Sequence, residues 1–191
     1  VSWGDWIWRV TWHKGTGYAM DYQIGPEERR GNTAFYLLKT TDGTHFEGVH
    51  RFQIDGFPNE ATIRFDSKGK MHILIRRETE DQMGMFAEAS SPYNQWDIYK
   101  TNYRLGGPNF VFIAGDKKVI GTRVHTPSVH MGLLTEDSRG TLREVIQLPS
   151  SGDCSYPGLL VKGKWLYVSY YSTHEGKSAI YFCRIPLSRF K

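Results

Sequence analysis

The chain contains 191 residues, of which 39% are hydrophobic, 14% aromatic and 23% charged. An ordinary charged fraction and a high aromatic content exclude a disordered chain. The apolar runs, of which Trp165–Val168 is typical, are too short to cross a membrane. The net charge is +4, but Lys and Arg alternate with Asp and Glu instead of clustering, so we expect no nucleic-acid partner.

One pattern recurs four times along the chain: an apolar strand, a tight polar turn and a second apolar strand. Runs rich in Val, Ile, Tyr, Phe and Trp predict strands, and helical periodicity is almost absent. The second strands begin at Tyr18, Met71, Val119 and near Leu166, at intervals of 53, 48 and 47 residues. The paired segments are Trp8–Trp12 with Tyr18–Tyr22, Ala61–Phe65 with Met71–Arg76, Phe110–Ile113 with Val119–Arg123, and Gly158–Val161 with Trp165–Tyr171.

Each repeat holds about four strands, because further strand candidates lie between these hairpins, and the last repeat is short by about one strand. Four antiparallel strands at a period of about 50 residues are typical of β-propeller blades, which stack so that each sheet covers its neighbour. We therefore predict an all-β fold, a β-propeller of four-stranded antiparallel blades. About four blades are present, with boundaries near 1–53, 54–106, 107–150 and 151–191. A β-sandwich of two similar halves fits the fourfold recurrence less well.

Two local features accompany the first repeat. In the segment Thr40–Phe46, Asp42-Gly43 supplies the positive φ of a hairpin turn, and this turn resembles a degenerate Asp-box of sialidase-type propellers. The tryptophans Trp3, Trp6, Trp8 and Trp12 carry aromatic surface that suits sugar stacking, but we expect most of them to pack between blades.

Polar side chains gather where each repeat begins its first strand and ends its second, which would bring them to one rim of a central channel. These positions hold Trp8, Arg9, Asn59, Glu60, Arg76, Arg77, Glu78, Pro108, Asn109, Arg123, Asp153, Ser155 and Tyr156. Arginine binds planar carboxylates, glutamate can act as a base, and tyrosine can act as a nucleophile once a base takes its proton. Because side chains alternate along a strand, at most one of Arg76 and Arg77 points into the channel.

Two segments carry a family resemblance. Asn59–Met71 resembles the sialidase segment with the catalytic glutamate, since Glu60 opens a strand and Arg76 closes the next one. Gly152–Leu159 resembles the tyrosine-bearing strand start of the same family, and Val168–Lys177 resembles the end of a unit in bacterial BNR-repeat proteins. Across its four repeats the chain is similar to the C-terminal part of a sialidase-like BNR-repeat protein.

The resemblance implies a six-bladed parent and a retaining exo-glycosidase (neuraminidase type) that removes terminal sialic acid or a related acidic sugar. It assigns Tyr156 as the nucleophile and Glu60 as its base. Sialidases use a tyrosine, and the physical reason is that the substrate carboxylate would repel a carboxylate nucleophile. Arg76 and Arg123 would bind that carboxylate. The resemblance also implies a secreted or periplasmic protein with a carbohydrate partner.

Further expectations concern residues around this assignment. Asn109 and Asp153 are additional substrate-binding candidates from their rim positions. We expect no cofactor and no metal, because no histidine has partners at a metal-ligand spacing. We expect Cys154 and Cys183 to be partly buried thiols and not a disulfide.

Two features of sialidases have no match in the chain. The only Arg-Ile-Pro, Arg184–Pro186, lies at the wrong end, and no aspartate occupies the place of the general acid. Activity would then depend on missing N-terminal blades or on another copy of the chain. The alternatives are a non-catalytic carbohydrate-binding or scaffold propeller, and a five-bladed glycosidase with carboxylates from Glu60, Glu78 and Asp153.

Overall fold

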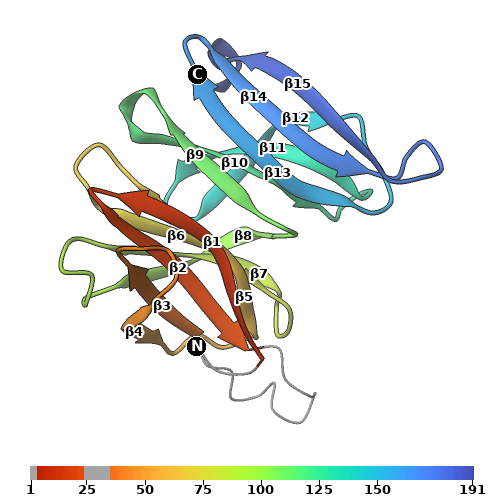
Figure 1. The fold of residues 1–191 in the computed structure, drawn as a ribbon. Helices are drawn as coiled ribbons and strands as arrows, with labels where there is room; N and C mark the ends of the chain where they lie inside the picture. Colours follow the sequence, from red (N-terminus) through yellow and green to blue (C-terminus); the bar gives the residue numbers. More distant parts are fainter. Residues whose placement is uncertain (1–3, 24–34) are drawn as a thin grey trace. The chain divides into compact units, whose positions relative to one another are not determined.

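The computed structural model describes residues 4–23 and 35–191 (Figure 1). Regular structure in this part of the chain is β-strand, apart from short 3-10 turns at Ala114–Asp116 and Leu187–Phe190. The chain divides into two compact units, Val1–Tyr99 and Lys100–Lys191. No helix in the described ranges has the length and apolar character needed to cross a membrane.

The first unit contains two antiparallel four-stranded sheets, each with its strands in chain order. The first sheet comprises β1 (Asp5–His13), β2 (Thr16–Gln23), β3 (Phe35–Thr40) and β4 (Glu47–Phe52). The second comprises β5 (Pro58–Phe65), β6 (Met71–Arg77), β7 (Met83–Ala89) and β8 (Asp97–Arg104), and β8 runs past the boundary between the units.

The second unit also contains two antiparallel sheets with strands in chain order. One comprises β9 (Asn109–Ile113), β10 (Lys117–Val124), β11 (His130–Ser138) and β12 (Thr141–Leu148). The other has three strands, β13 (Cys154–Lys162), β14 (Trp165–Ser172) and β15 (Ala179–Pro186). The predicted propeller blades are confirmed, and the last one is short by a strand, as its sequence indicated.

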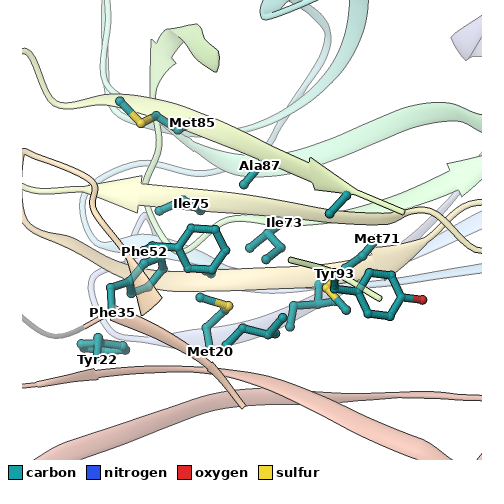
Figure 2. Close-up of a cluster of buried hydrophobic side chains, with 14 residues drawn as sticks. Met20, Tyr22, Phe35, Phe52, Met71, Ile73, Ile75, Met85, Ala87 and Tyr93 are labelled. Carbon is teal, nitrogen blue, oxygen red and sulfur yellow. The ribbon is translucent and has the colours of Figure 1, made fainter. Parts of the chain in front are cut away.

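The core of the first unit lies between its two sheets. Alternation along the strands directs Met20, Phe35 and Phe52 of the first sheet against Ile73 and Ile75 of the second, as Figure 2 shows. Burial of each such side chain contributes about 1.5–3 kcal/mol, so the facing sheets hold each other in place.

The core of the second unit has the same origin. In β14, buried and partly exposed residues alternate without interruption, and Leu166 and Val168 pack with Val119 and Leu133 of the neighbouring sheet. The opposite face of the three-stranded sheet leaves Phe182 69% exposed. The three-stranded sheet therefore commits one face to the core, whereas strands such as β6 and β11 are buried on both faces.

The tryptophans of β1 are only partly buried, contrary to expectation. Trp8 packs against the core, but Trp6 and Trp12 are 51% and 52% exposed, and Trp3 lies outside the described residues. A register shift follows Trp8, and the Thr11 hydroxyl then donates to the Ile63 carbonyl of the second sheet at 2.9 Å. Because Thr11 faces that sheet, Trp12 points to the other side.

The Asp42-Gly43 turn between β3 and β4 forms as predicted. Gly43 has φ +80°, and Asp42 Oδ1 accepts bonds from the Thr44 and His45 amides, both at 2.8 Å. Hydrogen bonds to the Asp42 carboxylate lower its pKa: the largest effect comes from the His45 backbone amide, followed by the His45 ring and the Thr44 amide. The carboxylate therefore closes the turn, which local sequence alone was able to predict.

Candidate functional site

Each sheet begins with a sharply turned residue in or just before its first strand. Arg9, Phe57, Gly107 and Tyr156 have φ values of 40°, 55°, 53° and 50°, and the last three each precede a proline. A positive φ in a residue with a side chain costs on the order of 1–3 kcal/mol, so the surrounding contacts must enforce it. The turn redirects the residues that follow, and these are the residues predicted to lie at the rim.

The Glu60 cluster, which comprises Asn59, Glu60, Arg76 and Glu78, lies at such a turn in the first unit. Asn59 and Glu60 form a bulge between the paired residues Pro58 and Ala61. The Asn59 side-chain oxygen accepts a hydrogen bond from the Glu60 backbone amide at 2.7 Å, and this bond fixes the bulge. Glu60 is 8% exposed.

Arg76 connects the two carboxylates of this cluster. One guanidinium nitrogen donates to Glu60 Oε2 at 2.7 Å, and the other contacts Glu78 Oε1 at 2.5 Å. The Asn59 amide also donates to Glu78 Oε1, at 3.2 Å. The arginine fork therefore holds two glutamates in fixed orientations, with Glu78 the more exposed of the pair.

Arg77 lies on the opposite face from Arg76, as alternation predicted. It is 1% exposed, and it donates to the Asp55 carbonyl at 2.9 Å, to the Asp55 carboxylate at 3.0 Å and to Asp81 at 2.6 Å. A fourth bond, of 3.1 Å, goes to the Met83 carbonyl. Arg77 ties the segment before β5 to the loop after β6, and its role is structural.

The Arg123 cluster, which comprises Arg123, Asp153, Tyr156 and Tyr171, lies in the second unit. Arg123 donates to Asp153 Oδ1 at 2.6 Å, to the Tyr171 hydroxyl at 3.2 Å and to the Cys154 carbonyl at 2.7 Å. The Tyr171 hydroxyl donates to the same Asp153 oxygen at 2.7 Å. Burial, followed by this bond to Asp153, raises the pKa of Tyr171 to about 12, so Tyr171 stays a neutral donor.

Tyr156 is the accessible tyrosine of the Arg123 cluster. It is 38% exposed, and its ring stacks on Tyr171 with centroids 6.0 Å apart and an interplanar angle of 19°. Gly107 lies against the Tyr156 ring so closely that a β-carbon there would clash. The ring is held in place while part of it remains open to solvent.

Asn109 connects two sheets of the second unit. It is 2% exposed, its amide nitrogen donates to the Pro157 carbonyl at 2.8 Å, and its oxygen accepts the Phe110 amide bond at 2.9 Å. These contacts support the turn next to Tyr156, so any contribution of Asn109 to substrate binding is through that turn.

The predicted site residues thus form two groups. Glu60 and Arg76 meet in the first unit, and Arg123, Asp153 and Tyr156 meet in the second. An approach of Tyr156 to Glu60 stays a prediction, because the two residues belong to different units. The sequence interpretation missed Tyr171, although it is the penultimate residue of β14, as Arg76 is of β6 and Arg123 is of β10.

Asp21 is a further carboxyl that the sequence interpretation missed. It is 5% exposed, and its Oδ1 has no hydrogen-bond partner in the described part of the chain. Burial, and then the nearby charge of Asp5, raise its pKa from 3.8 to about 6. Within the same ranges no group of three or more His, Cys, Asp or Glu could hold a metal ion, and Cys154 and Cys183 are free thiols.

No family model and no curated protein matches the sequence, but solved structures share its fold. A protein of unknown function from Dyadobacter fermentans has a TM-score of 0.79 at 15% identity, over 93% of this chain and 52% of that one. The xyloglucan PUL GH43B protein of Bacteroides ovatus has a TM-score of 0.61 at 16% identity, over 95% of this chain and 38% of that one. An exo-inulinase from Aspergillus awamori has a TM-score of 0.62 at 14% identity, over 94% and 48%.

The chain spans about half or less of the length of these three proteins. At such low identity the likeness is one of fold. None of the three is named as a sialidase, so the resemblance to sialidases rests on the motifs around Glu60 and Tyr156.

Proposed function

We propose that the chain is part of a glycoside hydrolase with a propeller fold, in which Glu60 is a catalytic carboxylate. The observation that carries this proposal is the pair Glu60 and Glu78 held on the single guanidinium of Arg76. The glycosidase names of two structural neighbours support the reaction class. The substrate is then a glycan, and a glycosidic bond is hydrolysed.

Two carboxylates suit this reaction. Most glycoside hydrolases place one carboxylic acid to protonate the leaving oxygen and one carboxylate to activate water or to attack the sugar. We assign these functions to Glu60 and Glu78, in a five-bladed protein. The fork of Arg76 is already engaged by two protein carboxylates, which favours this arrangement over one in which Arg76 binds the carboxylate of sialic acid.

A second candidate is the tyrosine mechanism of the sialidase type. It is favoured by the accessible, sharply turned Tyr156 beside Arg123 and Asp153. In that mechanism Glu60 would take the proton of Tyr156, and the substrate would be a terminal sialic acid. The two candidates agree on Glu60 and differ on Glu78 and Tyr156.

The test measures whether the full-length natural protein hydrolyses chromogenic arabinosides, xylosides, galactosides and fructosides. A fluorogenic sialoside is tested in parallel. We expect Glu60→Gln and Glu78→Gln each to lower kcat/KM by about 10²- to 10⁴-fold, the usual contribution of acid–base catalysis. Tyr156→Phe should stay within about tenfold of wild type. Glu47→Gln, a neutralised exposed glutamate in the same unit, is the matched control.

Different outcomes separate the candidates. The tyrosine mechanism would be established if the wild-type protein cleaves the sialoside, Tyr156→Phe abolishes that cleavage and Glu78→Gln leaves it unchanged. If a pure, folded protein binds glycans in the panel but cleaves none, the protein is a carbohydrate-binding propeller and the proposal is wrong.

A further inference from the structure

A cavity of about 630 Å³ lies in the first unit at the turn ends of its hairpins. Its walls come from the β1–β2 turn, the β5–β6 turn and the segment after β7, and we call it the turn cavity. Glu60 stands near the start of β5 and Asp66 directly follows its end. Six residues of extended strand separate them by roughly 20 Å, so the turn cavity is distinct from the Glu60 cluster.

Positive charge dominates the lining of the turn cavity. Lys14, Lys68 and Lys70 all line it. Lys70 is neutralised by an ion pair with Glu88, whereas neither Lys14 nor Lys68 has an ion pair with a carboxylate of the described residues. Two lysine charges therefore remain for a ligand.

The one acidic side chain in the lining, Asp66, offsets one positive charge overall, but among the described residues it forms no ion pair with Lys14 or Lys68. Its Oδ1 accepts the amide bonds of Lys68 and Lys70, both at 2.9 Å, and its Oδ2 lies 3.3 Å from the His72 ring. Burial opposes ionisation, but the bonds from Lys70, His72 and Lys68 outweigh it and lower the pKa of Asp66. The carboxylate is held by the turn and the strand beneath it.

The rest of the lining suits a sugar. Tyr18 and Tyr93 meet edge to face, with centroids 5.6 Å apart, and both border the cavity together with Ser90 and Ser91. Tyr93 is 7% exposed and donates its hydroxyl to the Gly69 carbonyl at 3.2 Å, so it supports Tyr18, which is the more exposed of the two rings. Aromatic rings pack against the apolar face of a sugar, and hydroxyls exchange hydrogen bonds with its rim. The volume lies within the range of about 300–1,000 Å³ typical of small-ligand sites.

We propose that the turn cavity binds an acidic saccharide. Its carboxylate or sulfate lies against Lys14 and Lys68, and its ring lies against Tyr18. This inference stands on the turn cavity alone and holds whether or not Glu60 is catalytic.

The test is calorimetric titration of the chain, at low ionic strength, with four probes: D-glucuronate, D-glucose 6-sulfate, D-glucose and inorganic sulfate. We expect one or both acidic sugars to bind more tightly than glucose and than inorganic sulfate. The double variant Lys14→Gln/Lys68→Gln should weaken that binding about tenfold or more. The control Lys162→Gln/Lys177→Gln removes two exposed lysines of the second unit and should leave it unchanged.

Further readouts keep the result independent of folding and of catalysis. The lysine variants should unfold at the wild-type temperature, and Glu60→Gln should bind the acidic sugar as wild type does. The proposal is overturned if neither acidic sugar binds, if glucose or inorganic sulfate binds as tightly, or if the two double variants behave alike.

Discussion

Two buried charged residues of the first unit have opposite surroundings. Arg77 is surrounded by four acceptors, two of them carboxylates, whereas Asp21 has an oxygen with no partner in the described part of the chain. An unpaired buried carboxylate opposes folding when it is ionised. Asp21 is therefore a residue at which a polar, uncharged side chain should be preferred.

We predict that Asp21→Asn stabilises the protein at pH 7 to 8 and gives no advantage near pH 4. The folded state holds the Asp21 proton with a pKa of about 6, against 3.8 ordinarily. Wild-type stability therefore falls as pH rises through this window, and the variant escapes that loss. Thermal unfolding of both proteins across this pH range measures the difference in stability. The control is Glu80→Gln, which neutralises a solvent-exposed carboxylate. An equal gain at pH 4 would contradict the explanation.

A short sequence repeat forms the turn before the first strand of two sheets, at β5 and at β9, and it positions the residues that follow. Phe57-Pro58-Asn59 and Gly107-Pro108-Asn109 are local repeats 50 residues apart, and both asparagines accept the amide bond of the next residue. In the first of them the residue after asparagine is Glu60, and in the second it is Phe110. The same backbone device thus supports a polar cluster in one sheet and packing in another.

At this scale we predict that Asn109→Ala lowers the free energy of unfolding by about 2–6 kcal/mol. The substitution removes the hydrogen bonds of the Asn109 side chain to the Pro157 carbonyl and from the Phe110 amide. Each buried group that loses its partner costs about 1–3 kcal/mol. Denaturant unfolding measures the loss. Asn94→Ala, the same change at an exposed position, should have little effect, and a loss as large there would contradict the assignment.

The whole molecule is organised as two units, each with a core of its own between two sheets. In the three-stranded sheet the two faces differ sharply, because Leu166 is fully buried and Leu160 is 60% exposed. Within the second unit this sheet therefore has one packed face, the one that meets the sheet of β9–β12.

A matched pair of substitutions measures this asymmetry. Leu166→Ala should cost about 2–5 kcal/mol, the range for a buried leucine, whereas Leu160→Ala should stay within about 0.5 kcal/mol of wild type. Equilibrium unfolding of the two variants compares them directly. Equal losses would show that the face carrying Leu160 is also packed in solution.

Local patterns determined the all-β fold, the paired hairpins and the Asp42-Gly43 turn, because alternation and turn residues act over a few neighbours. They also placed Glu60 near Arg76, since a hairpin of 16 residues brings them together.

Only the tertiary structure decided which polar groups meet beyond a hairpin. Arg123 finds Asp153 and Tyr171, 30 and 48 residues away, and the turn cavity assembles from three separate segments of the chain. Bulges decided the direction of Trp12 as well, since one extra residue in a strand reverses the face of every side chain after it. Strand pattern predicts the sheet, but register and sheet packing determine the chemistry at its ends.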